Sequence, residues 1–271
     1  MYLLDLKEIR PGDIILEEGD ERVAAATGGG PFGHASIAIG RLLFLEADGS
    51  SGVAVSGFEP EIWSMGTRST YAHTLAHEGV APKVRRLKMP KPITEIHGLA
   101  LGELGRDYSM DAAAKFPDLD STSRRLLLSR MRRAPKLPGP PDAPGRACSE
   151  VVAVILGLGV TAISPNGLAS HPDFVEVPAA VIDNTGGTWT CQPTGPARAE
   201  IAAAKSALRS SYAQDVHSAA QRVWASRQSV GTVPLDVPAV AAQLDRAIHA
   251  SMVTSIKAML SLDELAGNLL R

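Results

Sequence analysis

The stretch from Ala143 to Gly157, APGRACSEVVAVILG, constrains the fold of this chain more than any other part of the sequence. A loop rich in proline and glycine stops at Cys148, and a continuous apolar run follows it. This pattern predicts a buried helix that begins at the cysteine and ends near Gly157 or Gly159. Because the first turn of a helix carries unpaired N–H groups and a partial positive charge, it lowers the pKa of a thiol placed there. Cys148 is therefore either a nucleophile or a small buried residue, and the rest of the sequence has to decide.

The bulk properties exclude several classes of function. A chain of 271 residues is long enough for one large domain or for one domain with an appendage. Its net charge of −2 argues against a global field for nucleic acid or anionic membrane, and its 4% aromatic content argues against base stacking. We therefore expect no nucleic-acid partner. With Cys148 and Cys191 as the only cysteines, no disulfide framework is implied, although one bridge between the two stays open.

The N-terminal segment MYLLDLKEIRPGD lacks the basic flank and the long apolar core of a signal peptide. No apolar run reaches the roughly 18 residues that a membrane span needs. We expect a protein that is cytoplasmic as synthesised, and that is exported without a signal peptide if it acts in another compartment.

The order of patterns along the chain predicts an α+β fold. Short β-rich runs fill residues 11–55, and helical spacing follows at residues 96–109 (Ile96, Leu99, Leu101 and Leu104) and at residues 121–133. Residues 134–146 form a proline-rich loop, short elements follow the cysteine helix, and residues 184–196 mark a boundary. Two Ala-rich amphipathic helices are predicted at 197–228 and 236–270, the second with Ile256 and Met259 on its apolar face. The predicted organisation is a main domain over residues 1–195, with a small antiparallel sheet packed on helices, and a helical extension over residues 196–271.

His34 is the best candidate for a base among the seven histidines. A thiolate nucleophile needs a base that takes its proton, and the base needs a third group that orients its ring. His34 stands at the start of an alternating strand, directly after the glycine-rich approach GGGPFG, so its side chain points readily into a cleft. The alternative is that His34 lies at a strand end and has no functional role.

Glu46, on the next predicted strand, is the candidate for the orienting group, and its role depends on the length of the turn. If Gly40 and Arg41 form a two-residue loop, Glu46 lies opposite Ala35, on the wrong face for His34. If the loop has three residues, or contains a bulge, Glu46 lies opposite Ser36 and shares the face of His34. We predict the second arrangement, because Gly40 can supply the positive φ that such a loop requires. Asp48 has the same parity as Glu46 and is the reserve candidate.

Other candidate groups carry weaker signals. His73 and His77 would face together on a helix, but without a third ligand at a recognisable spacing they are interpreted as solvated residues, so no metal and no cofactor are expected. Cys191 is predicted to lie in a loop rich in glycine and threonine, without a basic neighbour, and is interpreted as structural. The tract from Arg124 to Lys136 carries six Lys or Arg and no acidic residue. It is either a solvated helix face or a surface for an anionic substrate or lipid headgroup.

Several short motifs in a specific order resemble a known family. RPGDIIL, GHASIAIG, LEADGSSGV, ACSEVVAVILG and ISPNGLASHPDFVEV resemble the circularly permuted branch of the NlpC/P60 papain-like hydrolases. That branch includes YiiX- and YaeF-like bacterial proteins and, more distantly, lecithin retinol acyltransferase. The resemblance covers roughly residues 8–180, and His34 precedes Cys148 as the permuted order requires. It implies Cys148 as nucleophile, His34 as base and Glu46 as the group that orients His34.

The resemblance also implies two lesser site residues and a reaction class. The GRDYS segment makes Tyr108 a candidate for substrate contact or oxyanion support, and the N–H groups at the start of the cysteine helix, near Ser149, form part of an oxyanion hole. The expected function is a cysteine hydrolase that cleaves an amide in a peptide or peptidoglycan-like substrate through an acyl-enzyme intermediate. The first alternative is a lipid acyl hydrolase or acyltransferase that uses the same site and that could act as a delivered antibacterial toxin. The second is a binding module without enzymatic activity. The C-terminal helices are expected to contact a protein partner or a second copy of the chain.

Overall fold

The structure is a computed structural model, and it describes residues 1–18, 30–48, 52–58, 61–75, 79–109, 144–159 and 162–192, together with positions 250, 253, 254, 256–261 and 263. Eleven strands, three α-helices and one 3₁₀ helix are assigned within these ranges. The strands are β1 (Tyr2–Asp5), β2 (Ile14–Glu17), β3 (His34–Ala38), β4 (Leu43–Asp48), β5 (Gly52–Gly57), β6 (Glu61–Met65), β7 (Arg68–Thr74), β8 (Lys83–Leu87), β9 (Phe174–Glu176), β10 (Val181–Asp183) and β11 (Thr190–Gln192). The helices are α2 (Ile93–Glu103), α5 (Cys148–Leu156), α6 (Pro165–Ser170) and the 3₁₀ helix η2 (Pro178–Ala180).

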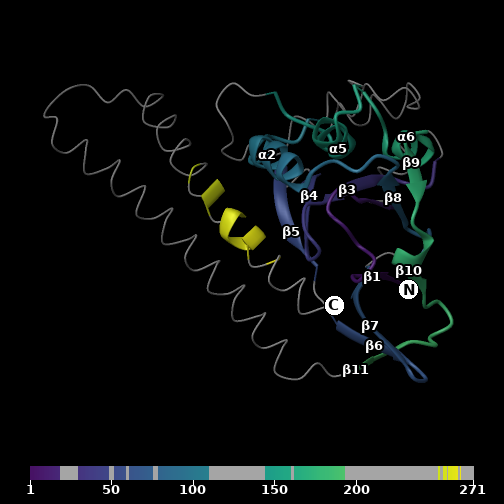
Figure 1. The fold of residues 1–271 in the computed structure, drawn as a ribbon. Coiled ribbons are helices and arrows are strands. Elements are labelled where there is room, and N and C mark those ends of the chain that lie inside the picture. Colours follow the sequence, from purple (N-terminus) through teal and green to yellow (C-terminus); the bar gives the residue numbers. More distant parts are fainter. Residues whose placement is uncertain are drawn as a thin grey trace, which may run out of the picture.

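The fold is α+β, as predicted, but it contains two antiparallel sheets where the sequence predicted one small sheet. The six-stranded sheet has the order β5-β4-β3-β2-β8-β9, and the five-stranded sheet has the order β10-β1-β7-β6-β11. Figure 1 shows α2 and α5 on one side of the six-stranded sheet, with the five-stranded sheet away from these helices. The second sheet was missed because its strands come from distant parts of the chain: β1 pairs with both β7 and β10.

The alternation of buried residues in β2 explains this layered arrangement. Ile14 and Leu16 belong to the core cluster that contains α5 and α2, whereas Ile15, between them, belongs to a second cluster with Leu4 of β1. Successive side chains of a strand point to opposite faces, so β2 is apolar on both faces and is covered on both. The IIL run of the sequence therefore reflects a central strand between two buried layers.

The helix that opens with Cys148 matches the prediction. Helix α5 begins at Cys148 and ends at Leu156, and Gly157 closes it in a left-handed conformation with φ of 63°. Its residues Val151, Val152 and Ile155 are fully buried against the six-stranded sheet. The apolar run is continuous because both the sheet and α2 cover the helix.

Two local predictions are wrong in detail. The predicted apolar stripe of the helix before the proline-rich loop included Leu99, but Leu99 of α2 is exposed, and Ile96 and Ala100 are the residues that enter the core. Cys191 does not lie in a loop: it is the central residue of β11, opposite Trp63 of β6, and its side chain is exposed. The predicted boundary at residues 184–196 therefore contains an edge strand of the second sheet.

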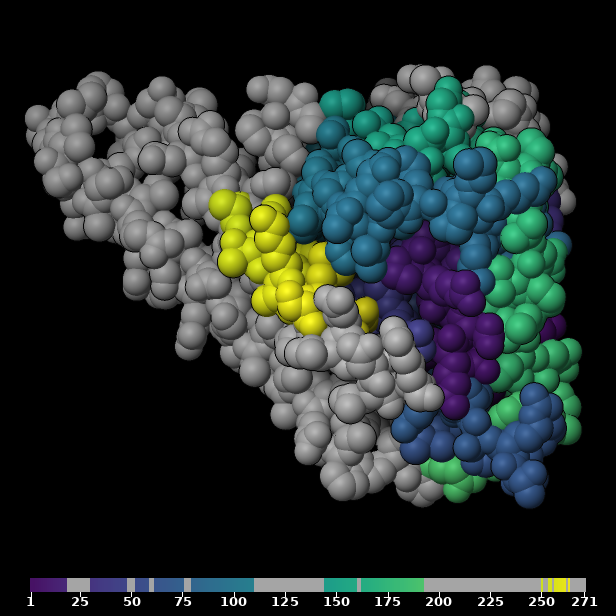
Figure 2. Space-filling view, in the orientation of Figure 1, coloured from purple at the N-terminus to yellow at the C-terminus, as the bar shows by residue number. Residues whose placement is uncertain are grey.

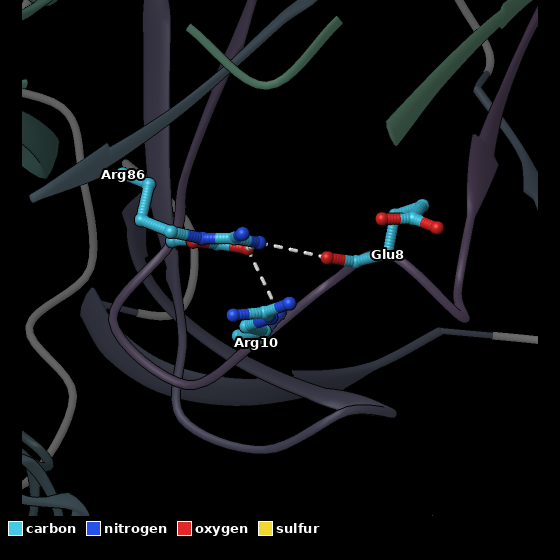
Figure 3. A network of polar contacts seen from close by, with 4 residues as sticks. Glu8, Arg10 and Arg86 are labelled. Carbon is cyan, nitrogen blue, oxygen red and sulfur yellow. Dashed lines mark hydrogen bonds and ion pairs between the residues drawn. The ribbon is translucent and has the colours of Figure 1, made fainter. Parts of the chain in front are cut away.

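A buried ion pair holds the turn that precedes β2 (Figure 3). The carboxylate of Asp13 is fully buried and accepts from Arg86 Nε and Nη2, each at 2.7 Å, and from the backbone N–H of Arg10 at 2.8 Å. The same guanidinium donates to the carbonyl oxygen of Glu8 at 2.8 Å. This network raises the pKa of Arg86 through its hydrogen bond to Asp13. It ties β8 to the segment that leads into the central strand.

The described positions between 250 and 263 are helical and pack on the rest of the described fold (Figure 2). Ile256 and Leu260 join the core cluster of α5, and Val253 and Met259 pack against it. Asp263 accepts from the backbone N–H groups of Arg41 (2.8 Å) and Leu42 (2.6 Å), in the turn between β3 and β4. The predicted helix at 197–228 and most of that at 236–270 lie outside the described residues.

No helix in the described part of the chain is both long enough and apolar enough to cross a membrane.

Candidate active site

The turn between β3 and β4 sets the position of Glu46 and confirms the predicted register. Ile37 pairs with Leu45 and Ala38 pairs with Phe44, so the antiparallel strands are joined by a three-residue loop. The backbone N–H groups of Ile39 and Gly40 both donate to the carbonyl oxygen of Leu43, at 3.0 and 3.1 Å. Continuation of this register places Glu46 opposite Ser36, on the face that His34 shares.

His34 and Glu46 are in direct contact. The Nε2 atom of His34 lies 2.8 Å from Oε2 of Glu46, and the side chains are 22% and 20% exposed. The other carboxylate oxygen, Oε1, accepts from the hydroxyl of Ser56 on β5 at 2.7 Å. Glu46 is thus held from both sides, and its carboxylate fixes which nitrogen of the imidazole is left for another partner.

That partner is Cys148. The hydrogen bond and charge of His34 act on the thiol, and the backbone N–H groups of Ala35 and Ser149 also hydrogen-bond to it. Burial raises the pKa of Cys148, but these contacts outweigh the burial, so the thiol pKa lies below its ordinary value. His34 is the first residue of β3 and Cys148 is the first residue of α5, so the two groups meet where the strand and the helix begin.

The pKa of His34 shifts in the opposite direction. Burial alone would lower it, but the hydrogen bonds and charges of Cys148 and Glu46 raise it well above its ordinary value. A lowered thiol pKa and a raised imidazole pKa together favour a thiolate paired with an imidazolium. Cys148 is only 3% exposed, so this charge pair lies almost out of contact with solvent on the sulfur side.

Ser149 contributes to the site through its backbone, while its side chain makes a different contact. Its N–H hydrogen-bonds to the Cys148 sulfur, whereas its fully buried hydroxyl donates to the carbonyl oxygen of Ile163 at 2.5 Å. The carboxylate of Glu150 accepts from the N–H of Ala147 at 3.2 Å and so caps the first turn of α5.

The segment that delivers Cys148 is joined to the segment containing Tyr108. Tyr108 forms a parallel bridge with Arg146, and its side chain packs against the main core cluster. Arg146 lies 3.0 Å from the buried carboxylate of Glu103. Tyr108 therefore lies beside the segment that leads into Cys148. Asp48, the reserve candidate, ends β4 opposite Gly52, and its side chain lies outside the described residues.

Those of the weaker candidates that the structure describes do not join this site. His73 lies on β7 and not on a helix, with its ring 5.2 Å from that of Phe58, and His77 lies outside the described residues. Among the side chains that the structure describes, no group of three or more His, Cys, Asp or Glu could hold a metal ion. The two cysteines are free, one buried and one exposed, so no bridge joins them. The basic tract from Arg124 to Lys136 lies outside the described residues.

Two contacts of the site were not predicted from the sequence. The first is the contact of Glu46 with Ser56, which lies on the neighbouring strand β5. Glu46 pairs with Ala54, and the period of two puts Ser56 on the same face as Ala54, so this contact follows once the pairing is known. The N–H of Ala35 also acts on the thiol. No sequence signal reveals a backbone donor, because every residue other than proline has one.

The arrangement suits nucleophilic chemistry. A thiolate at a helix N-terminus has an imidazolium beside it as proton donor, and a carboxylate holds the imidazole in one orientation. Comparison of the chain with protein-family models, with curated proteins and with solved structures finds no match.

Proposed function

We propose that this chain is a cysteine hydrolase that cleaves an acyl bond through an acyl-enzyme intermediate on Cys148. The observation that carries the proposal is the hydrogen-bonded series from Cys148 to His34 to Glu46, together with the opposite pKa shifts of the first two groups. A cysteine that only fills space in a core needs neither an imidazole partner nor a lowered pKa.

In the first half of the proposed reaction, the Cys148 thiolate attacks the substrate carbonyl carbon and forms a C–S bond. The charge moves to the carbonyl oxygen, where N–H groups at the start of α5 stabilise it. The His34 imidazolium then gives its proton to the leaving amine as the C–N bond breaks. An acyl thioester on Cys148 and a neutral His34 remain.

In the second half, water attacks the thioester and neutral His34 accepts its proton. Expulsion of the Cys148 thiolate releases the carboxylic acid and restores the resting pair of thiolate and imidazolium. Glu46 is a positioning residue: its contact with Nε2 keeps the imidazole oriented and favours the protonated ring.

The sequence resemblance supports the choice of substrate and fold. We assign the chain to the permuted NlpC/P60 papain-like type on the order of its motifs, and we take as substrate an amide in a peptide or peptidoglycan-like molecule. The α+β fold, with the histidine hairpin before the cysteine helix, is compatible with that assignment.

The test is product release and intact mass spectrometry after incubation with panels of peptides, muropeptides and phospholipid vesicles. The wild type is expected to release an amine from a peptide or muropeptide and to show an acyl adduct on Cys148. Cys148→Ala should abolish both signals, and His34→Ala should lower kcat/KM by about 10²- to 10⁴-fold, the range for loss of a general acid–base.

Cys191→Ser is the matched control, because it removes the chain's other thiol at an exposed position. It should leave adduct and product unchanged. An adduct confined to Cys191, or no product from any panel, would overturn the proposal. Release of fatty acid by the wild type, and not by Cys148→Ala, would keep the chemistry and replace the amide substrate with a lipid ester.

A further inference from the structure

The short segment from Ile163 to Gly167 contacts both halves of the candidate site. Its first residue accepts the hydroxyl hydrogen of Ser149, the neighbour of Cys148, at 2.5 Å. Its fourth residue, Asn166, makes two hydrogen bonds to the backbone of Phe32, two residues before His34. The segment thus spans the distance between the nucleophile helix and the base strand.

The contact between Asn166 and Phe32 is two-sided. Oδ1 of Asn166 accepts from the N–H of Phe32 at 3.0 Å, and Nδ2 donates to the carbonyl oxygen of Phe32 at 3.0 Å. A side-chain amide that satisfies both polar groups of one residue holds that residue as a neighbouring strand would. Downstream, the N–H of Gly33 donates to the carbonyl oxygens of Glu17 and Glu18, so the backbone is fixed up to His34.

Gly30, in the glycine-rich segment before β3, leaves room for the side chain of Asn166. A Cβ atom built on Gly30 would lie 2.2 Å from Cγ of Asn166, so only glycine allows the amide to reach Phe32. This contact explains why position 30 requires glycine, which the sequence pattern did not reveal.

The segment itself is rigidly held. Ser164 caps α6 by accepting from the N–H of Gly167 at 3.0 Å, and Ile163 and Leu168 are buried in the main core cluster. A rigid support matters because a hydrogen bond between thiol and imidazole requires placement to within about 0.5 Å.

We propose that residues 163–167 form a positioning brace for the pair of Cys148 and His34, with Asn166 as the residue that places His34. The inference rests on the proposed function for its purpose, but its test reads the state of the thiol and needs no substrate. Without the brace, the imidazole loses its alignment with the sulfur, and the Cys148 pKa rises toward its ordinary value.

The experiment measures the pH dependence of iodoacetamide alkylation of Cys148, with Cys191→Ser as the background. Asn166→Ala should move the midpoint of the alkylation pH profile upward by about one pH unit, so that the rate at Cys148 falls more steeply between pH 8 and pH 6 than in the parent protein. The control is Ser170→Ala, at the exposed end of the same helix, whose hydroxyl contacts only the carbonyl oxygens of Asn166 and Gly167. It should leave the pH profile unchanged.

A second variant keeps the test decisive if Asn166→Ala unfolds. Gly30→Ala leaves every hydrogen-bonding group in place but pushes the amide away, and it should shift the pH profile in the same direction. Because the added methyl group meets the Asn166 side chain, the double variant Gly30→Ala with Asn166→Ala should shift the pH profile no further than Asn166→Ala alone. Additive effects would overturn the proposed contact.

The outcomes separate the brace from the reaction. A lower urea midpoint with an unchanged pH profile would show that Asn166 is only structural and would overturn the brace. A shifted profile in a protein whose wild type releases no product would keep the brace and reject the hydrolase. An unchanged pH profile in Asn166→Ala, together with product release by the wild type, would reject the brace and keep the hydrolase.

Discussion

At the scale of single residues, the proposed chemistry rests on the pair of Cys148 and His34, in which each group shifts the pKa of the other. The pKa of His34 is raised by Cys148 and by Glu46, and the pKa of Cys148 is lowered by His34. Reciprocal dependence of this kind is a property of a coupled pair, so removing one member must change the titration of the other.

The first prediction concerns the imidazole of His34. Cys148→Ala removes one of its two partners and Glu46→Gln replaces the charged carboxylate, so each should lower the His34 pKa measured by NMR titration. Cys148→Ala should have the larger effect, because the hydrogen bond to Cys148 is the largest of the contributions that raise this pKa. Replacing His97 with Gln is the control, since that ring contacts the carbonyl oxygen of Ile39 and neither site partner. An unchanged His34 titration in Cys148→Ala would contradict the ion pair.

The second prediction concerns the two thiols. An activated thiol is expected to alkylate quickly, but Cys191 is exposed and Cys148 is 3% exposed, so absolute rates do not separate activation from access. The pH dependence does separate them. Between pH 8 and pH 6, the alkylation rate at Cys148 should fall much less than the roughly tenfold per pH unit of a free cysteine in solution, and much less than the rate at Cys191. Parallel curves for the two cysteines, followed by peptide mass mapping, would contradict an activated Cys148.

The start of α5 at Cys148 and the contact of His34 with Glu46 were predictable because both follow local rules: a segment rich in proline and glycine precedes the helix, and the period of two puts His34 and Glu46 on one face. The positive φ expected of Gly40 was wrong: a Cβ atom there would lie 2.3 Å from Oδ2 of Asp263, so glycine leaves room for that side chain. The prediction of a three-residue or bulged loop is confirmed by the pairing of Ile37 with Leu45 and of Ala38 with Phe44. The partner of Asn166 was not predictable, because nothing in either segment marks a contact across 134 residues.

At the scale of elements, the central strand β2 depends on a buried charge. Asp13, just before β2, is fully buried and is neutralised by Arg86 of β8. The GD pair of the sequence indicates a turn, but its ionic partner lies 73 residues away and leaves no local trace. The same limit applies to the second sheet: alternating apolar and polar residues indicate its strands, but they do not indicate which strands pair.

The third prediction tests this ion pair. Arg86→Met leaves the Asp13 carboxylate buried without its cation and should lower the free energy of unfolding by about 3–5 kcal/mol, measured by urea titration. The double variant Asp13→Asn with Arg86→Met should be more stable than Arg86→Met alone, because no buried charge is left unpaired. Lys83→Met, on the same strand, breaks the exposed pair with Glu176 and should cost less than about 1 kcal/mol. Equal costs for Arg86→Met and Lys83→Met would contradict a structural role of the buried pair.

At the scale of the whole molecule, the described helical positions between 250 and 263 pack against the main core and contact the turn between β3 and β4. Asp263 is 8% exposed and accepts from two backbone N–H groups of that turn. Burial raises the pKa of this carboxyl, while the contacts with Arg41 and Leu42 and the charges of Arg41 and His97 only partly oppose it. The predicted extension thus contributes to the same core as the site.

The fourth prediction follows from the sign of that shift. A carboxyl with a raised pKa in the folded state binds more protons there than in the unfolded state, so its contribution to stability decreases as pH rises from the ordinary carboxyl pKa through the raised value. Asp263→Asn should remove this part of the pH dependence, as measured by urea titration between pH 4 and pH 7. Asp263→Ala, which leaves both N–H groups unpaired, should cost about 1–3 kcal/mol. A pH dependence identical in wild type and Asp263→Asn would contradict the assignment.

The contact between Asp263 and the turn at Arg41 and Leu42 joins residues that are 221 and 222 positions apart. During synthesis, the hairpin that carries His34 and Glu46 leaves the ribosome long before its turn has an acceptor for these two N–H groups. Cys148 follows later, and residues 163–167, which contact Ser149 and the backbone of Phe32, later still. Under the proposed brace, reactivity should arrive only with the completed fold, and a ribosome-bound fragment that stops short of residue 163 should carry Cys148 without its alignment to His34.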